Sequence, residues 1–264
     1  MPSFEIRAAS ADDFSSAVDW AAAEGWNPGL GDLEAFHAAD RSGFLMGFVD
    51  GAPASSISVV RYGADFGFLG FYIVHPDHRG TGLGIQTWHA GMAHLDGRTI
   101  GLDGVVAQQD NYRKSGFVLA GRNVRHSGVA KPIDAPEAHD IRPVTEDHLD
   151  AVFAYDNRHF PAPRAGFIRE WVMPAGDDAG RRSVLAVADG GITGLGTIRA
   201  CRSGYKIGPL FADDDATART LFQTLTAGLP EGAGVSLDTP DDNPAAVAIA
   251  VDAGLQPVFE TARM

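Results

Sequence analysis

The chain has 264 residues, of which 45% are hydrophobic, 21% charged and 9% aromatic, and its formal net charge is −13. This length favours two domains, and the composition is that of a globular protein and excludes disordered, collagen-like and coiled-coil classes. Because the chain is this acidic, it offers no broad basic surface to a phosphodiester backbone. We therefore expect no nucleic-acid partner.

The first half of the chain predicts a regular alternation of strands and helices. Ser10 with Asp13 three residues later is typical of a helix N-cap with an acidic first turn. Asp50-Gly51 between two apolar runs indicates a β-hairpin. In chain order we expect a strand at 4–8, helices at 10–24 and 32–39, hairpin strands around Asp50-Gly51, a strand at 66–74, a helix at 85–95, a strand at 99–102, a helical turn at 111–115 and a strand from Phe117.

Helix 85–95 is expected to bury one face, because its apolar residues recur at helical spacing. These residues are Ile85, Trp88, Met92 and Leu95.

The chain contains an internal repeat, because three segments recur in the same order at nearly constant spacing. The matched segments are IRAASADDF at 6–14 with IRPVTEDHL at 141–149, Asp50-Gly51 with Asp189-Gly190, and Gly116-Phe117 followed by Arg125 with Gly254-Leu255 followed by Arg263. The repeat predicts two domains of the same architecture, 1–130 and 138–264, joined by a proline-containing linker at 126–140.

A glycine-rich turn, HRGTGLG at 78–84, lies between the predicted strand at 66–74 and the helix that follows. Glycines at a strand-to-helix turn let backbone N–H groups converge on an anion, and the helix N-terminus adds its positive end. An arginine at the rim suits a diphosphate because its guanidinium is forked and always charged. We predict a diphosphate-binding site formed by Arg79, Gly80, Thr81, Gly82, Leu83 and Gly84.

Two known nucleotide-binding motifs fit this turn less well. A P-loop is excluded because no lysine follows the glycines. The dinucleotide fingerprint GxGxxG is incomplete, although Asp103 lies about 20 residues further on, where that motif places an acidic residue. A purely structural turn that binds nothing also stays open.

The strand, the RGTGLG turn and the helix together resemble the R/Q-x-x-G-x-G/A motif of the GCN5-related N-acetyltransferases (GNAT). The predicted element order is similar to that family's, and the segment YRKSGF at 112–117 resembles its Tyr-containing segment before the last strands. The resemblance covers residues 4–126, and with the repeat it implies an α/β fold with mixed sheets in two tandem GNAT-like domains, the C-terminal one degenerate.

The resemblance implies that the first copy binds acetyl-CoA, with the pantetheine arm along the strand at Ile73 and Val74. A primary amine of a small molecule or peptide would attack the thioester, and a backbone N–H near Val74 would stabilise the oxyanion. Tyr112, with an ordinary pKa near 10, would protonate the departing thiolate. A non-catalytic module that binds or senses acyl-CoA is the alternative.

The chain departs from the family pattern at two points. Val105 stands seven residues before Tyr112, where the family has an asparagine, and the strand at 66–74 lacks the glutamate that many members use as a base. Candidate bases are His75, Asp103 and Tyr72.

The second copy carries Asp213, Asp214 and Asp215 where the glycine-rich turn would lie. These carboxylates would repel a diphosphate, so we expect no CoA binding there, and this copy would instead help to form the acceptor pocket or serve the structure. Trp26, Asn27 and Asp156 are the predicted acceptor-binding residues.

No metal, membrane or disulfide is expected. The longest apolar stretch, at 66–74, is far shorter than the roughly 20 residues that span a bilayer. The first ten residues lack the apolar run of a signal peptide, which predicts a cytoplasmic location. Cys201, the only cysteine, is predicted to be a small buried hydrophobe, and the histidines show no metal-ligand spacing.

Overall fold

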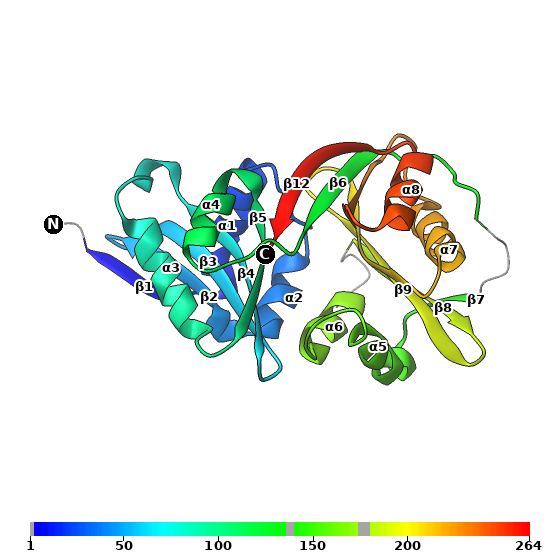
Figure 1. Cartoon of the computed structure of the whole chain (residues 1–264), viewed down its shortest axis with the longest axis horizontal. Coiled ribbons are helices and arrows are strands. Elements are labelled where there is room, and N and C mark those ends of the chain that lie inside the picture. Colours follow the sequence, from blue (N-terminus) through cyan, green and yellow to red (C-terminus); the bar gives the residue numbers. More distant parts are fainter. Residues whose placement is uncertain (1–2, 136–139, 174–179) are drawn as a thin grey trace. The chain divides into compact units, whose positions relative to one another are not determined.

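The structure is a computed structural model that describes residues 3–135, 140–173 and 180–264. It divides into two compact units (Figure 1). Unit 1 consists of Met1–Pro28, Asp32–Leu102 and Pro161–Phe167, and unit 2 of Gly29–Gly31, Asp103–Phe160 and Ile168–Met264. The domain limits expected from the repeat, 1–130 and 138–264, stay a prediction.

Unit 1 is built on a sheet with the strand order β1-β2-β3-β4-β5. The pairs from β1 to β4 are antiparallel, whereas β4 and β5 are parallel. The strands are β1 Phe4–Ala8, β2 Phe44–Val49, β3 Ala52–Tyr62, β4 Phe66–Val74 and β5 Thr99–Val105, the last of which continues into unit 2.

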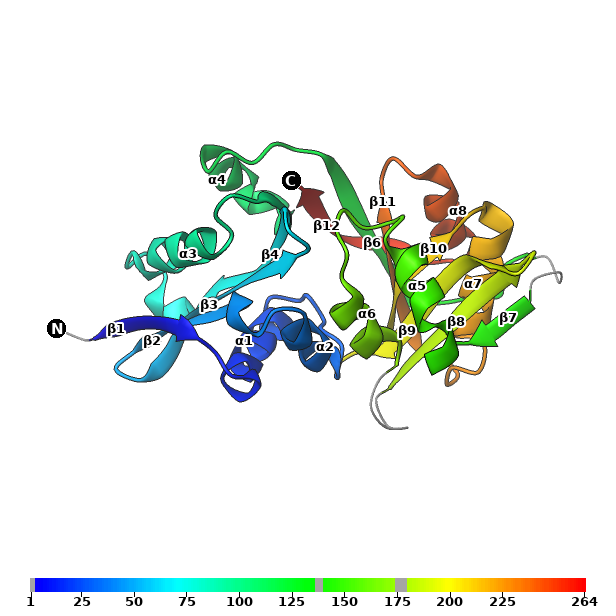
Figure 2. The same cartoon turned by 90° about the horizontal axis from the view of Figure 1, so that it is seen from below.

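Helices cover both faces of this sheet. Figure 2 shows α1 (Ala11–Ala23) and α2 (Asp32–Ala39) on one face and α3 (Leu83–His94) on the other. The predicted cap of the first helix is confirmed, because the Ser10 side chain accepts a hydrogen bond from the Asp13 N–H and the Asp13 carboxylate accepts one from the Ser10 N–H.

The buried face of α3 differs from the predicted one. Trp88 and Leu95 are buried, but Ile85 is 53% exposed. Glycine contributes to the buried face instead, since a Cβ on Gly91 would lie 2.8 Å from Ile57 Cδ1 on β3. A hydrophobic pattern does not register such a glycine, which lets the helix approach the sheet closely.

Unit 2 contains a sheet with the strand order β12-β6-β11-β10-β9-β8-β7. Its core includes residues of the helices α7 and α8, which pack on β8 to β11. The elements of this unit are α4 Gln109–Lys114, β6 Gly121–Val129, β7 Asp140–Pro143, α5 Leu149–Asp156, α6 Ala165–Val172 (shared with unit 1), β8 Arg181–Ala188, β9 Gly191–Ala200, β10 Tyr205–Ala212, α7 Asp215–Thr226, β11 Gly234–Pro240, α8 Pro244–Asp252 and β12 Gln256–Arg263.

The element order from β7 to β12 repeats that from β1 to β6, as the internal repeat predicts. Both hairpins form at the predicted dipeptides: φ is +47° at Asp50 and +83° at Gly51, and +51° at Asp189 and +79° at Gly190. Left-handed conformations at both central residues are what the tight hairpin turn requires.

The closing strand of the first repeat begins at Gly121, later than Phe117, and runs to Val129. The predicted linker was therefore wrong in its first four residues, and also at Asp140, where β7 begins. The first four residues form a strand because β6 pairs with β11 on one side and with β12 on the other. Residues 136–139 of that linker lie outside the described residues. Within the described residues, no helix is both long and apolar enough to cross a bilayer.

Candidate functional site

The glycine-rich turn of unit 1 leaves the N-terminus of α3 open. Gly80 and Gly82 have φ of +75° and +84°, which favours glycine. Gly82 is the N-cap of α3 and provides no side-chain hydrogen bond, and a Cβ on either glycine would meet no atom within 4 Å in the described structure. The N-cap residue thus leaves the first N–H groups of α3 without a side-chain cap, and the space beside both glycines is open, an arrangement that suits an anion.

The third glycine of the turn has a different role. A Cβ on Gly84 would lie 2.8 Å from Val74 Cγ2 and 3.1 Å from the Tyr72 hydroxyl, so glycine is needed for α3 to pack against the end of β4. Thr81 donates its hydroxyl hydrogen to the carbonyl of His78 at 2.6 Å and closes the turn.

The pairing of β4 with β5 ends before β4 reaches this turn. Their pairing runs from Phe66 with Thr99 to Leu69 with Leu102, whereas β4 continues to Val74. Beyond Leu69, the β5-facing edge of β4 has no strand partner within unit 1, so an extended ligand with amide groups can pair with it.

The same stretch of β4 contains a β-bulge that the sequence analysis missed. The register with β3 shifts between the pairs Ser56–Ile73 and Ser58–Gly70, which leaves two residues of β4 opposite one of β3. Phe71 in the bulge has a φ of +46°, and its carbonyl accepts a hydrogen bond from the Ser56 hydroxyl at 2.8 Å. A phenylalanine in the left-handed region is strained, and residues with such backbone strain cluster at active and binding sites. The glycines at 67 and 70 were the available signal, since glycine inside a strand often marks a bulge.

Arg79 lies at the rim of the turn with its guanidinium already engaged. Its Nε donates to the carbonyl of Val74 at 3.0 Å, and its Nη2 donates to Glu24 Oε1 at 2.5 Å. The side chains of Arg79 and Glu24 are 51% and 40% exposed, so this is a surface ion pair. Glu24 did not appear among the predicted site residues, because nothing in a sequence pairs positions so far apart.

The three candidate bases have different surroundings. The His75 ring lies 5.6 Å from that of Trp20, and its Nδ1 is 3.6 Å from the Asp77 carboxylate. Burial raises the pKa of the Tyr72 hydroxyl, which therefore stays protonated and is disfavoured as a base. In unit 2, Asp103 is held by the guanidinium of Arg263 at 2.5 and 2.8 Å.

Tyr112 belongs to α4 in unit 2 and is buried. Its ring lies against Gly104, where a Cβ would come within 2.2 Å, and edge-on to Phe117 at 6.5 Å between centroids. One turn earlier, Gln109 is also buried and its amide nitrogen has no hydrogen-bond partner within the described structure. The catalytic role of Tyr112 stays a prediction.

The predicted acceptor residues occupy contrasting positions. Trp26 and Asn27 lie half-buried in the loop after α1, where Asn27 has a φ of +50°. Asp156 ends α5 in unit 2 and is only 1% exposed. Their contact with an acceptor stays a prediction.

In the second copy, aspartate side chains occupy the corresponding turn. Asp214 is the N-cap of α7 and accepts a hydrogen bond from the Thr217 N–H at 2.7 Å. Asp213 accepts hydrogen bonds from the Tyr155 hydroxyl and the Arg158 guanidinium, both at 3.0 Å. Protein groups thus occupy this helix N-terminus, and the absence of CoA binding in the second copy stays a prediction.

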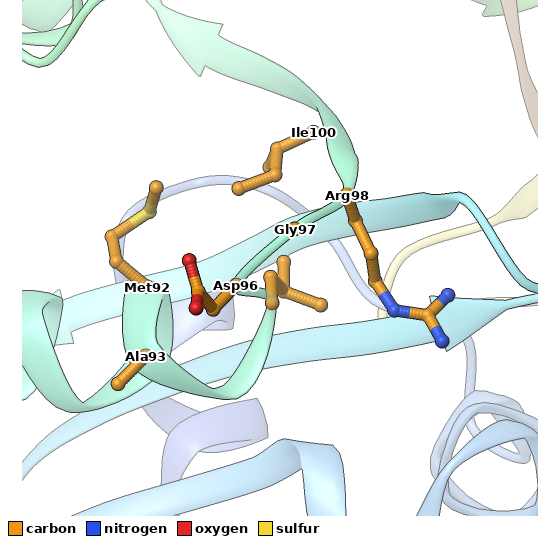
Figure 3. A pocket seen from close by; sticks show the side chains of 7 residues that line it. Met92, Ala93, Asp96, Gly97, Arg98 and Ile100 are labelled. Atoms are coloured by element: carbon orange, nitrogen blue, oxygen red, sulfur yellow. The ribbon is translucent and has the colours of Figure 1, made fainter.

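A separate hollow of about 520 Å³ lies at the C-terminal end of α3 (Figure 3), and no residue of the glycine-rich turn lines it. It contains none of the predicted site residues, and Arg98 at its edge donates to the carbonyls of Gly63 and Phe66. The residues that line it are Met92, Ala93, Leu95, Asp96, Gly97, Arg98 and Ile100. Among the described residues, no cluster of His, Cys, Asp or Glu is arranged to hold a metal ion.

Comparisons with known proteins identify the family of both halves of the chain. The model of the acetyltransferase (GNAT) family matches residues 6–117, and that of an acetyltransferase (GNAT) domain matches residues 152–264. The holothin acyltransferase of Pseudoalteromonas sp. (strain SANK 73390) is 34% identical over 257 residues, which cover 97% of this chain and 85% of that protein.

Solved structures share the fold over nearly the whole chain. A putative acetyltransferase from Pyrococcus horikoshii has a TM-score of 0.80 at 21% identity and covers 99% of this chain and 88% of its own. A tandem GNAT protein from the clavulanic acid biosynthesis pathway has a TM-score of 0.67 at 15% identity, and the match covers 99% of this chain and 97% of that protein. With two GNAT domains in one chain and a curated relative along its length, the chain belongs to the GNAT family and is a tandem GNAT acyltransferase.

Proposed function

We propose that this enzyme transfers an acetyl group from acetyl-CoA to a primary amine, and that the reaction takes place in the first GNAT copy. The observation that carries the proposal is the open N-terminus of α3, where the first N–H groups have no side-chain cap and the space beside Gly80 and Gly82 is open. The end of β4 beyond its pairing with β5 offers backbone groups to the amides of a pantetheine arm.

In the proposed reaction, the amine nitrogen attacks the thioester carbon and the C–S bond breaks. A backbone N–H near Val74, at the end of β4 that follows the bulge at Phe71, stabilises the negative charge on the carbonyl oxygen. Tyr112 gives its proton to the departing CoA thiolate, the excess proton of the amine passes to water, and a proton from water then restores Tyr112.

The proposal names both the acyl group, acetyl, and the class of acceptor, a primary amine. The relative from Pseudoalteromonas is named as an acyltransferase of holothin, so a small-molecule amine is an acceptor class to test first. Release of free CoA thiol should be measured with acetyl-CoA and with longer acyl-CoA thioesters against a panel of small amines and peptides. Turnover with acetyl-CoA supports the proposal, and turnover with longer donors alone would overturn the acetyl assignment.

The first experiment is isothermal titration of the full-length protein with acetyl-CoA, with NAD as the control ligand. We expect saturable binding near one equivalent, because only the first copy keeps an open turn. Arg79→Glu should abolish it by placing a second carboxylate beside Glu24 at the rim. Binding of NAD in place of acetyl-CoA would contradict the proposal, and saturable binding without turnover on any amine would favour the alternative of an acyl-CoA-binding module.

A further inference from the structure

The ion pair between Glu24 and Arg79 poses a question about the anion site. Arg79 is the charged side chain of the glycine-rich turn, yet a carboxylate already holds it at 2.5 Å. The pair has no net charge, in a chain whose formal charge is −13. A diphosphate that approaches the turn therefore meets backbone N–H groups and a guanidinium whose charge is neutralised.

We propose that Glu24 is a positioning residue that sets the affinity for the acyl donor by competing with its diphosphate for Arg79. The inference rests on the proposed function, and it adds a residue outside the glycine motif to the donor site. It predicts that substitution of Glu24, which removes the ion pair with Arg79, strengthens binding of the acyl donor. If the ion pair only supported the fold of the turn, its loss would weaken that binding.

The geometry favours competition over simple support. The guanidinium is fixed at one nitrogen by the carbonyl of Val74 and at another by Glu24, and an arginine has more N–H donors than these two contacts use. A carboxylate and a phosphate are both anionic acceptors that suit the guanidinium fork. The diphosphate can reach the N–H donors that remain, but Glu24 already neutralises the guanidinium charge, so the two anions compete for the charge of Arg79.

Glu24 is held in place by the end of a helix. It is the C-cap of α1, and its backbone N–H donates to the carbonyls of Trp20 and Ala22. The ring of Trp20 contacts His75, the residue that follows β4. The backbone that carries the carboxylate is therefore fixed. Glu24 loses little conformational entropy when it pairs with Arg79, which strengthens its competition with an incoming anion.

The effect should fall on binding and leave the chemical step unchanged. The diphosphate does not change during acyl transfer, so its interaction with Arg79 is equally strong in the ground state and the transition state. Glu24→Gln should lower KM for the acyl donor without raising kcat. Because the product CoA carries the same diphosphate, its affinity should increase by the same factor.

Glu24→Gln separates charge from shape, because the amide oxygen can still accept from Arg79. We measure CoA binding by titration in the wild type, Glu24→Gln, Arg79→Gln and the double variant. At low salt, Glu24→Gln should bind CoA about two- to fivefold more tightly, the range that the strength of an exposed ion pair allows. The gain should shrink at high salt and disappear in the Arg79→Gln background.

Glu34→Gln is the matched control, since Glu34 is an exposed residue of α2 in the same unit and its substitution removes the same charge. Its CoA affinity should equal that of the wild type. Unchanged or weaker CoA binding in Glu24→Gln would overturn the inference. An equal gain in affinity in the wild-type and Arg79→Gln backgrounds would also overturn it, because Glu24 would then act only by repelling the ligand's negative charge. If the wild type itself binds no CoA, the proposed function fails and this inference falls with it.

Discussion

Tyr112 is the side chain on which the proposed proton transfer depends. Tyr112→Phe removes the hydroxyl and keeps the ring contacts with Gly104 and Phe117. We expect kcat to fall by about a hundredfold, the lower range for loss of a general acid, with little change in affinity for acetyl-CoA. Steady-state kinetics and titration measure the two effects, and thermal unfolding controls for the fold. An unchanged kcat would remove Tyr112 from the mechanism.

Asp40 makes the stability of unit 1 depend on pH. Burial disfavours its charged form, but hydrogen bonds from His94, Ser42 and the Arg61 N–H outweigh burial and lower its pKa. A carboxylate with a lowered pKa contributes stability above the ordinary value of about 4, and this contribution is lost as the pH falls through the lowered folded-state pKa.

We therefore expect Asp40→Asn to be less stable than the wild type at pH 6, and the difference to shrink as the pH falls below about 4. Urea unfolding at a series of pH values measures this. Asp65→Asn, at an exposed turn of the same unit, is the control for loss of one carboxylate and should be as stable as the wild type at pH 6. A constant difference between Asp40→Asn and the wild type across that range would contradict the prediction.

At the scale of elements, the contact between α3 and the sheet depends on glycine. A Cβ on Gly91 would lie 2.8 Å from Ile57 Cδ1 and 3.0 Å from Val59 Cγ1, closer than packed carbons allow. We expect Gly91→Ala to lower the free energy of unfolding by about 1–3 kcal/mol, the usual effect of overpacking a core.

Gly166→Ala on α6 is the matched control for Gly91→Ala, because a Cβ there would meet no atom within 4 Å in the described structure. The same substitution in open space should stabilise the helix by up to about 1 kcal/mol. Chemical unfolding of both variants tests the pair, and a Gly91→Ala protein as stable as the Gly166→Ala protein would contradict the close approach of α3.

Most elements of the first repeat could be predicted, because their signals are local. The capping box at Ser10 and Asp13, the left-handed turn at Asp50-Gly51 and the strand at 66–74 each depend on neighbouring residues. The bulge at Phe71 was missed because it arises from how β4 pairs with β3. The exposed position of Ile85 was missed for a similar reason, since the face of α3 that meets the sheet includes Gly91, which packs against Ile57 of β3.

At the scale of the whole molecule, unit 2 joins strands from both repeats. β6 of the first repeat lies between β11 and β12 of the second, and β12 also pairs with residues Asp103–Val105 of β5. A fragment that ends at residue 130 would lose both neighbours of β6 and expose two strand edges, a condition that promotes aggregation.

We therefore expect residues 1–130 to be insoluble or aggregated when produced alone, and residues 131–264 likewise. Co-production of the two fragments should restore a soluble complex that binds CoA as the intact chain does. Size-exclusion chromatography and titration measure the outcome. A soluble, monomeric 1–130 fragment would contradict the dependence of β6 on the second repeat.

Features with a local physical cause could be predicted from the residues alone. Glycine at 80 and 82, the two hairpin dipeptides and the repeated element order predicted the open turn, the duplication and the fold, because backbone conformation and periodicity are properties of neighbouring residues. Three features were decided by tertiary structure alone: the ion pair of Glu24 with Arg79, the early end of the pairing between β4 and β5, and the place of β12 between β5 and β6. Each joins residues far apart in the chain, and such pairs form only when the whole chain packs.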